Sequence, residues 1–483
     1  MMPSDFIYLS ILTPLIVFLI TPLLKNFTVQ RDLLGPIGGV ISFFSSINIT
    51  NLVLEGKEVK LTLINISDGL SISFNVYPLG AIFGLVASGL WILASIYSIG
   101  YMRGNKELNQ TRFFSFYAIS IFAALCIAYS GNLLTLFIFY EILTFSTYPL
   151  VAHKQDDLSK KSGRLYMGIL VGTSVVFLLP AIIIVWVTTG TLDFAKNGIL
   201  DGQLEEKYIP FLLFLFAFGI GKAALMPFHK WLPAAMVAPT PVSALLHAVA
   251  VVKAGVFSIL VVIVNVFGID FLSKTQSTFW LICLACFTLL LSSIIAIYKD
   301  DLKARLAYST ISQLSYVVLG AALVSNLAVQ GASMHIVMHA VGKITLFFVA
   351  GAIYVSAHLS KISELDGQGK SMPLLFFAFF VGSLSIIGVP PMGGSWSKFY
   401  LMIGAVESDY FFVIAVLCIS TLLNVYYLLE IPARAFFKEK IREVKVEKHP
   451  LMIIPTLFAA ILTVIIFFYI EPIKNLTNLI TSN

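Results

Sequence analysis

The chain has 483 residues, of which 58% are hydrophobic and only 12% are charged, and its mean hydropathy is +0.93. A soluble globular domain carries about 25% charged residues, because a polar surface must cover its apolar core. In this chain the charges are separated by apolar runs of about twenty residues, the length that spans a bilayer as a helix. The composition excludes a disordered chain, a secreted disulfide scaffold and a cytosolic enzyme, and it predicts an all-α polytopic membrane protein.

Apolar runs between charged or turn-rich breaks predict about fourteen transmembrane helices. The first run has no basic residue before it and no small-residue cleavage site, which is typical of a retained helix rather than a signal peptide. In chain order, the predicted spans lie near residues 5–24, 33–54, 77–100, 112–129, 132–152, 163–188, 209–226, 240–265, 276–297, 303–323, 328–356, 374–403, 410–430 and 452–470.

The lysines and arginines alternate between the two sides of the membrane that these spans define. One set of alternate connections holds 21 of the 31 basic residues and the other set holds six. Positive charge stays on the cytoplasmic side, and a wrong helix count would scramble this alternation. We therefore expect a multi-pass protein of the cell inner (plasma) membrane with both termini on the outer side. The net charge of +6 is then a topological bias and not a nucleic-acid-binding surface.

The four remaining basic residues are lysines inside predicted spans, where a glutamate and three histidines also lie. Ionisable groups are costly at membrane depth, so they normally face a bundle interior or water and mark an ion or proton path. A single buried lysine could be a structural residue, but a group of eight ionisable side chains makes that interpretation weaker. The eight candidate proton-transfer residues are Glu141, Lys222, Lys253, Lys398, His247, His335, His339 and Lys343.

Spacing supports a shared path for part of this group. His335, His339 and Lys343 are separated by four residues each, which places them on one helical face. Glu430 is followed directly by Ile431 and Pro432, and we interpret it instead as a residue at the interfacial end of a helix.

Two predicted helices are interrupted, each next to one of the lysines. The seventh span breaks up over residues 219–227 and ends in Pro227, while the twelfth contains the prolines Pro390 and Pro391 and the glycine Gly393. Proline removes a backbone donor and clashes with the preceding turn. Non-helical backbone is tolerated at this depth only when it is buried in protein or lines a wet cavity. Two broken helices in corresponding positions are typical of an inverted repeat with a midplane site, although two unrelated proline kinks are the alternative.

The two breaks lie five spans apart, and an odd number of spans reverses the direction across the membrane. Spans 4–8 should therefore be repeated in inverted orientation by spans 9–13. The predicted organisation is three N-terminal helices over 1–110, a first five-helix repeat over 111–270, a second over 271–432 and a C-terminal helix over 433–483.

Motifs for metals, redox groups and nucleotides are incomplete. The four cysteines all lie in apolar runs, and the Cys283–Cys286 pair has no second pair or nearby histidine, so packing is favoured over a metal, redox or iron–sulfur role. The glycines over 219–224 follow no strand, and residues 364–371 lack the first glycine of a phosphate loop because position 364 is glutamate. We expect no metal and no cofactor in this chain.

Several strings of this sequence resemble the antiporter-like subunits shared by Mrp cation/proton antiporters, respiratory complex I and energy-converting membrane hydrogenases. The resemblance covers nearly the whole chain, and its most specific string is Met-Pro-Phe-His-Lys-Trp-Leu-Pro at 226–233. The other matching strings lie at 139–141, 238–247, 251–255, 301–303, 306–313 and 335–343.

The resemblance implies roles for the buried residues. Glu141 would be the glutamate that pairs with the lysine of span seven, Lys222, and would switch its charge. Lys253 would be the central relay and Lys398 the terminal group that faces a second half-channel. The remaining residues would extend the polar axis with the help of water: His247, His335, His339 and Lys343.

Three departures narrow the resemblance. Many members carry an acid and a histidine after Trp-Leu-Pro, where this chain has Ala234 and Met236. Span twelve carries Lys398 instead of the glutamate of one complex I subunit type. The chain also lacks the long C-terminal extension of the largest members. It most resembles the D-type subunit of an Mrp antiporter or its hydrogenase counterpart.

The leading functional prediction is a proton-translocating subunit, coupled to Na⁺, within a complex of several membrane subunits. The alternative is a proton-pumping membrane subunit of a complex I-like NADH/quinone oxidoreductase or membrane-bound hydrogenase, in which case the complex is an enzyme although this chain holds no redox or hydrolytic centre. A scaffold with an inert polar axis is disfavoured, because Glu141, Lys222, Lys253 and Lys398 are all present.

Overall fold

Helical backbone occupies each of the fourteen predicted ranges. The computed structural model describes residues 2–440 and 443–482, with the side chains of Leu246 and His247 left out. Within those residues, ten helices are long and apolar enough to cross a membrane, and shorter apolar helices lie at 251–267 and 373–387. The all-α polytopic class is confirmed. The count of fourteen spans stays a prediction, because interruptions shorten several of the remaining helices.

The N-terminal part consists of long helices and one β-hairpin that the hydropathy pattern did not predict. The strands β1 (Lys60–Ser67) and β2 (Leu70–Asn75) pair antiparallel between α2 and α3. The side chain of Asn132 caps α5 by accepting from the backbone N–H of Thr135 at 2.8 Å. The helices are α1 (Pro3–Ile20) with the 3₁₀ turn η1 (Thr21–Leu24), α2 (Thr28–Leu54), α3 (Pro78–Gly104), α4 (Gln110–Ala128), α5 (Leu133–Val151), and α6 (Asp157–Thr173), which continues through the π-turn η2 (Ser174–Leu178) into α7 (Leu179–Thr189).

The middle part is the least regular. The predicted span 209–226 is helical only as far as Gly219, and a chain of short turns leads from there to the next long segment. In order, the elements are η3 (Glu206–Tyr208), α8 (Ile209–Gly219), η4 (Gly221–Ala223), α9 (Trp231–Ala234), η5 (Ala235–Val237), α10 (Thr240–Ala244), the π-turn η6 (Leu245–Val249), α11 (Val251–Val261), the π-turn η7 (Val262–Phe267) and α12 (Ile269–Ser273).

The C-terminal part contains the second interrupted helix, α16 and α17, and an additional helix that the hydropathy pattern did not predict. That helix, α20, is amphipathic and packs its buried residues Leu476, Thr477 and Ile480 toward α15 and α3. The elements are α13 (Phe279–Ile297), α14 (Leu302–Ala322), α15 (Asn326–Ala357), η8 (Ile362–Leu365), η9 (Gln368–Lys370), α16 (Pro373–Ile387), α17 (Gly394–Glu407), α18 (Phe411–Phe437), α19 (Pro450–Phe468) and α20 (Glu471–Thr481).

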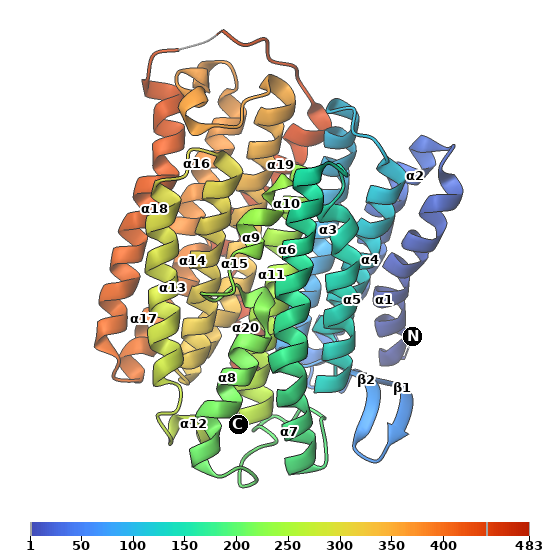
Figure 1. Ribbon diagram of the computed structural model, residues 1–483, viewed down its shortest axis with the longest axis vertical. Coiled ribbons are helices and arrows are strands. Elements are labelled where there is room, and N and C mark those ends of the chain that lie inside the picture. Colours follow the sequence, from blue (N-terminus) through green and yellow to red (C-terminus); the bar gives the residue numbers. More distant parts are fainter. Residues whose placement is uncertain (1, 441–442, 483) are drawn as a thin grey trace.

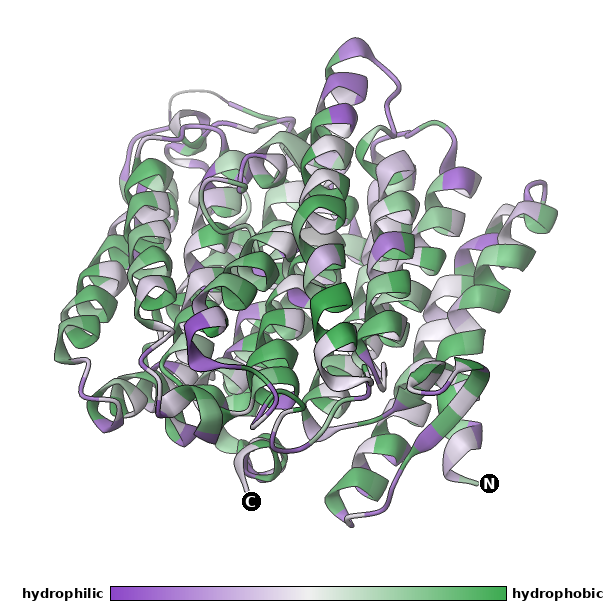
Figure 2. Cartoon of the chain, turned by 60° about the horizontal axis from the view of Figure 1, so that its bottom comes forward, coloured by the Kyte–Doolittle hydropathy of each residue, from purple (hydrophilic) through white to green (hydrophobic). Residues whose placement is uncertain are grey.

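The helix α15 forms the centre of the bundle. Its most apolar stretch is buried throughout, and it contacts α3, α10, α11, α14, α16, α17, α19 and α20. The outer helices instead expose large apolar side chains, as the hydropathy colouring of their surfaces shows (Figure 2). This arrangement puts polar residues of α15 out of reach of lipid.

The two halves of the bundle have matching neighbour relationships. In the first half α4 contacts α5, α5 contacts α6, and η4 contacts α11; in the second half α13 contacts α14, α14 contacts α15, and α17 contacts α18. The contact of α4 with α11 corresponds to that of α13 with α18. The helix α8 rises from the lower end of the bundle to its break, whereas α16 and α17 descend from the upper end (Figure 1).

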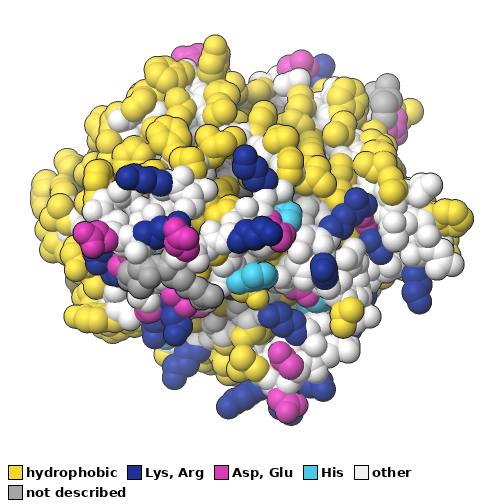
Figure 3. Space-filling model, turned by 90° about the horizontal axis from the view of Figure 1, so that it is seen from above, with side chains coloured by type: hydrophobic (Ala, Val, Ile, Leu, Met, Phe, Trp, Pro, Cys, Tyr) yellow, Lys and Arg dark blue, Asp and Glu magenta, His cyan; other side chains and the backbone are white. Residues whose placement is uncertain are grey.

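Charge is distributed unequally between the two ends of the bundle. Seen from above, the upper end carries many Lys and Arg side chains surrounded by a hydrophobic border (Figure 3). The connections at this end include those from α5 to α6, from α13 to α14 and from α18 to α19. Both marked chain ends lie in the lower part of the molecule, together with the β-hairpin (Figure 1). We refer below to the upper end as the basic end.

Candidate functional site

The interruption after α8 places Lys222 inside the bundle. The helix ends at Gly219, and Lys222 lies in the 3₁₀ turn η4, two residues before Ala224, whose φ is +56°. Gly255 of α11 packs against this turn: a Cβ at Gly255 would lie 2.3 Å from the carbonyl carbon of Lys222. Only glycine permits so close an approach of two backbones, so α11 fixes the position of the turn.

The Lys222 side chain is fully buried and is held by α5. Its Nζ donates hydrogen bonds to the carbonyl oxygen of Tyr140 at 2.8 Å and to Thr144 Oγ1 at 2.5 Å. It also lies 3.1 Å from the centre of the Tyr140 ring, a cation–π contact. The amine therefore has acceptors whether or not a carboxylate approaches it.

Glu141 does not pair directly with Lys222 in this structure. Among the described residues, neither carboxylate oxygen of Glu141 has a hydrogen-bond partner, and both oxygens are buried. Successive residues of an α-helix point about 100° apart, and Lys222 is bound on the face that carries Tyr140 and Thr144. The sequence prediction places Glu141 beside the right helix turn, but the direct pair is absent from the arrangement seen here.

The second interruption places Lys398 in an equivalent setting. The helix α16 ends at Ile387, and α17 begins at Gly394. The Lys398 Nζ donates to the carbonyl oxygen of Ile387 at 2.9 Å and lies 4.7 Å from the centre of the Tyr316 ring on α14. A cavity of about 360 Å³ between α17 and α18 reaches this amine and is also lined by Thr421.

The prolines and glycines of the two breaks lie outside regular helix, where the sequence predicts the interruptions. Pro227 follows η4, and Pro390, Pro391 and Gly393 lie between α16 and α17. The peptide bonds Met226–Pro227 and Pro390–Pro391 are cis. The N–H of Gly393 donates to the carbonyl oxygen of Thr463 on α19 at 3.0 Å, so the second break is anchored to a neighbouring helix.

A run of hydrogen-bonded and stacked side chains connects Lys253 with Lys398 across α15. Lys253 of α11 is hydrogen-bonded to Nδ1 of His339. The His339 ring stacks on that of His335 with centroids 5.9 Å apart, and Nδ1 of His335 lies 2.9 Å from Ser397 Oγ. Ser397 precedes Lys398 in α17, so four of the predicted residues form one continuous axis.

Lys343 shares the helix face of His335 and His339 but faces a different neighbour. Its Nζ donates to Ser309 Oγ of α14 at 2.6 Å. The Tyr427 hydroxyl of α18 is 2.8 Å from the same serine oxygen and also hydrogen-bonds Asn424. Sequence reasoning missed Ser309, Tyr427 and Asn424, although Ser309 lies inside one of the family-like strings and thus carried a signal.

The axis is not continuous between Lys222 and Lys253. None of the hydrogen bonds among the described side chains joins the two amines, which are linked only through the packing of η4 against Gly255. His247 lies in the π-turn η6 between them in the sequence, but its side chain lies outside the described residues.

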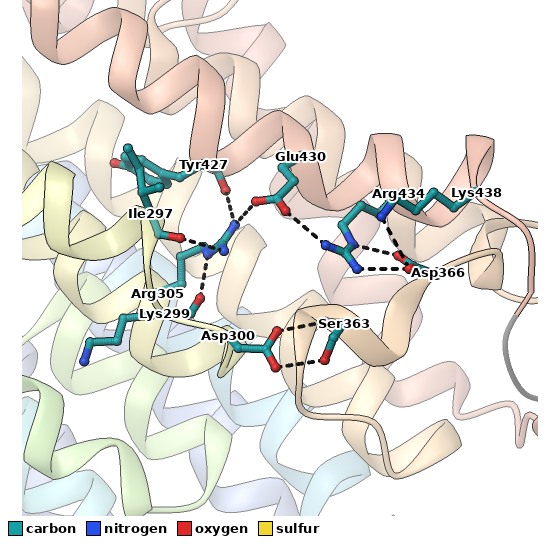
Figure 4. Close-up of polar contacts among 10 residues, drawn as sticks. All are labelled: Ile297, Lys299, Asp300, Arg305, Ser363, Asp366, Tyr427, Glu430, Arg434 and Lys438. Carbon is teal, nitrogen blue, oxygen red and sulfur yellow. Dashed lines mark hydrogen bonds and ion pairs between the residues drawn. The ribbon is translucent and has the colours of Figure 1, made fainter.

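A network of charged residues closes the basic end next to α18. The buried guanidinium of Arg305 donates to a carboxylate oxygen of Glu430 at 2.5 Å and to the carbonyl oxygen of Tyr427 at 3.1 Å. Arg434 donates to the other oxygen of Glu430 at 3.2 Å and to both oxygens of Asp366 at 2.6 and 2.9 Å (Figure 4). Glu430 is 29% exposed, which agrees with a position near a helix end, but it is held between two arginines.

The cysteines and candidate metal ligands are dispersed. Cys126 and Cys286 are buried, while Cys283 and Cys418 are exposed, and all four are free thiols. Within residues 2–440 and 443–482, no group of three or more His, Cys, Asp or Glu side chains is placed to hold a metal ion.

Comparison with known proteins agrees with this arrangement. The family model described as NADH:quinone oxidoreductase/Mrp antiporter, TM matches residues 130–424. A putative antiporter subunit mnhA2 of Staphylococcus haemolyticus is 29% identical over 94% of this chain, and the chain spans 61% of that protein. The NADH-quinone oxidoreductase subunit N of Desulforudis audaxviator is 32% identical over 73% of this chain and 72% of its own length.

Two solved structures share the fold. A chain of an archaeal membrane-bound sulfane sulfur reductase superposes with a TM-score of 0.87 at 23% identity, and a chain of the Mrp complex from Dietzia sp. DQ12-45-1b with a TM-score of 0.85 at 18% identity. Each match covers 99% of this chain and 97% of the other chain. Together with the family match over more than half of the sequence, the relatives establish that the chain belongs to the NADH:quinone oxidoreductase/Mrp antiporter transmembrane family.

Proposed function

We propose that the chain is a proton-translocating, antiporter-like subunit of a complex of several membrane proteins, most like the Na⁺/H⁺ antiporter subunits of Mrp systems. The observation that carries this proposal is the buried run from Lys253 through His339 and His335 to Ser397 and Lys398. Ionisable groups in the centre of a membrane bundle are costly and have a transport role in most proteins that keep them. The names of the antiporter relatives support the same assignment.

Protons would enter the run at Lys222 under the control of Glu141. A lysine in low-dielectric surroundings loses its charge readily, and a nearby carboxylate restores it. At an effective dielectric constant near 20, two charges a few ångströms apart interact by a few kcal/mol, which changes the protonation equilibrium by more than tenfold. Movement of Glu141 toward Lys222 would load the amine with a proton, and withdrawal would drive that proton toward Lys253.

Water would complete the path. Several buried polar atoms along it have no hydrogen-bond partner among the described residues, and buried polar groups are normally satisfied by protein or by ordered water. These atoms include both carboxylate oxygens of Glu141 and the Nε2 atoms of His335 and His339. Protons could pass along such waters where side chains do not touch, as between Lys222 and Lys253.

We infer that the chain contains two five-helix repeats in inverted orientation, over 111–270 and 271–432, flanked by the N-terminal segment 1–110 and the C-terminal segment 433–483. The matching neighbours of the two halves and the opposite directions of α8 and α16 support this division. Each broken helix also places its lysine over a tyrosine ring, Lys222 over Tyr140 and Lys398 over Tyr316. An experimental structure in which the two halves fail to superpose after rotation about an in-plane axis would refute it.

The proposed location is the cell membrane, with both termini on the outer side and the basic end in the cytoplasm. The positive-inside tendency of membrane proteins supports this orientation. Labelling of single cysteines introduced at the β-hairpin and at the connection from α5 to α6 would test it, because a membrane-impermeant reagent added to intact cells should reach only the hairpin.

A second candidate function is a proton-pumping membrane subunit of a complex I-like oxidoreductase or a related respiratory complex. The relationship to subunit N, which covers similar shares of both chains, favours keeping it. Mass spectrometry of the complex purified through a tag on this chain separates the two functions. Hydrophilic iron–sulfur subunits would indicate the redox complex, and membrane subunits alone would indicate the antiporter.

Proton transport by the purified complex in liposomes tests the central proposal. Lys222→Ala and Lys398→Ala should each abolish transport measured with a trapped pH-sensitive dye, because each removes a protonatable group of the axis. The exposed Lys474→Ala is the matched control and should transport normally. If both buried variants assemble and transport at the wild-type rate, the proposed function is wrong.

A further inference from the structure

Polar side chains follow one face of α14 and one face of α18 from the middle of the bundle to the basic end. In both helices the spacing of three or four residues keeps them on a single face. We call this set the α14–α18 seam, and it consists of Arg305, Ser309, Gln313 and Tyr316 on α14 and Ser420, Asn424, Tyr427 and Glu430 on α18.

Hydrogen bonds cross the seam at each level. Near the middle of the bundle, the Tyr316 hydroxyl donates to Ser420 Oγ at 2.9 Å. One level closer to the basic end, the Tyr427 hydroxyl lies 2.8 Å from Ser309 Oγ. At the basic end, Arg305 binds both the Tyr427 carbonyl oxygen and the Glu430 carboxylate (Figure 4). The seam is thus a continuous polar contact between two membrane helices.

The seam joins the buried lysine axis at two points. Lys343 donates to Ser309 at 2.6 Å, and Lys398 lies over the ring of Tyr316. Both lysines are therefore connected to a row of polar groups that leads toward the basic end, separately from the η4 turn that holds Lys222.

Unpartnered polar atoms lie along the seam. Both side-chain polar atoms of Gln313 and the Nδ2 of Asn424 are buried and have no hydrogen-bond partner among the described residues. Such groups at membrane depth need water, because an amide without a partner costs several kcal/mol in an apolar environment. The seam has sites for ordered water next to the hydroxyls of Ser309 and Tyr427.

We propose that the α14–α18 seam is a second proton path, which connects Lys343 with the basic end and in which Tyr427 is the relay. The proposal rests on the proton-transport function proposed above. A hydroxyl group donates and accepts at once, so it passes a proton without changing its own charge. The Lys343 ammonium gives a proton to Ser309 Oγ, Ser309 gives its own hydroxyl proton to the Tyr427 oxygen, and Tyr427 gives its own to water beside Asn424. Lys343 is left neutral, both hydroxyls are intact, and the water carries the charge onward.

Arg305 closes this path at the basic end in the structure described here. Its buried positive charge lies between the Tyr427 carbonyl and Glu430, and it would repel a proton that approaches along the seam. The path opens when the pair between Arg305 and Glu430 separates, so the seam is gated at the end that faces the predicted cytoplasm.

The competing explanation is that the seam only fastens two helices together, as hydroxyl and amide side chains do in many membrane bundles. Tyr427→Phe removes the proposed relay and keeps the ring. Tyr129→Phe is the matched control, because the Tyr129 hydroxyl is also buried and also bonds a serine of another helix, Ser46, at 2.8 Å, away from the axis.

Proton transport by the whole complex in liposomes decides between the two explanations. Tyr427→Phe should lower the initial rate at least about tenfold, the smallest effect typical of a lost proton-transfer group, while Tyr129→Phe stays at the wild-type rate. Wild-type transport by Tyr427→Phe overturns the proposal, and so do equal losses in both variants, which would indicate a packing effect.

Two further variants complete the test. If the Tyr427→Phe complex does not assemble, Ser309→Ala replaces it, with the same expected loss and the same refuting result. Lys222→Ala separates failure of the seam from failure of the proposed function. A defect in Lys222→Ala with normal transport by Tyr427→Phe refutes the seam alone, whereas normal transport by Lys222→Ala refutes the proposed function and the seam with it.

Discussion

The amine of Lys222 donates to the carbonyl oxygen of Tyr140 at 2.8 Å and lies 3.1 Å from the centre of that residue's ring. Neutral groups of α5 therefore hold the lysine, while the carboxylate of Glu141 on the same helix has no partner among the described residues. The geometry keeps the lysine in place and leaves the glutamate available to change its charge. That separation of anchoring from charge control underlies the first prediction.

Replacing Glu141 by glutamine should abolish proton-coupled transport without loss of assembly. Glutamine keeps the shape of the side chain but cannot supply the negative charge that loads Lys222, so the rate in liposomes should fall at least about tenfold. The control is Glu55→Gln, which neutralises an exposed glutamate that pairs with Lys57. Equal rates for Glu141→Gln and the wild type would contradict the switching role.

Replacing Gly255 by alanine should destabilise the protein and displace Lys222. The new methyl group would lie 2.3 Å from the Lys222 carbonyl carbon, so the backbone of η4 must shift. Overpacking of this kind costs about 1–3 kcal/mol, and thermal unfolding in detergent should show a lower midpoint together with slower transport.

The control for Gly255→Ala is Gly172→Ala, at a helical glycine that has open space around it. Alanine favours helix over glycine by about 1 kcal/mol, so this variant should unfold at the same temperature or a higher one. A Gly255→Ala protein as stable and active as Gly172→Ala would show that the close approach of α11 to η4 is unimportant.

Replacing Asp366 by asparagine should weaken the network at the basic end. Asp366 accepts two hydrogen bonds from Arg434, at 2.6 and 2.9 Å, and is itself nearly buried. Hydrogen bonds to charged groups contribute about 1.5–3 kcal/mol, so the unfolding midpoint should fall. Glu205→Gln breaks an exposed pair with Lys207 and should change the midpoint little, since such pairs contribute about 0–1 kcal/mol. Similar midpoints for the two variants would contradict the importance of this network.

Stability should fall in mildly acidic solution because of His153, which lies between α5 and α6. Burial, helped by the positive charge of Arg112, lowers the pKa of His153 from 6.5 to about 4. The unfolded chain therefore binds a proton at a higher pH than the folded chain does. This contribution is fully present above pH 6.5 and is lost as the pH falls toward 4, with a loss on the order of 2 kcal/mol by pH 5.

The variant His153→Gln tests this assignment by removing the titrating ring. Unfolding midpoints measured at pH 7.5 and pH 5 should differ less for His153→Gln than for the wild type. If the pH dependence of the two proteins is the same, His153 is not its source.

The sequence alone predicted the helical ranges well, because a membrane helix needs an uninterrupted apolar stretch whose limits hydropathy reveals. It did not predict the hairpin from Lys60 to Asn75 or the helix α20 (Glu471–Thr481), which are too polar or too short to give that signal. The alternation of charge also indicated which connections share an end of the bundle, and the structure places these connections together (Figure 3).

For the site, the sequence identified which ionisable residues lie inside spans, because a charge in an apolar run is conspicuous. Only the tertiary structure decided their partners. Lys222 and Tyr140 are 82 residues apart, and Tyr427 and Ser309 are 118 apart. Helical periodicity fixes the face on which a residue lies but not the helix that packs against that face. For this reason the Lys253–His339 contact, the turn of Lys343 toward Ser309 and the unpaired Glu141 were settled by packing alone.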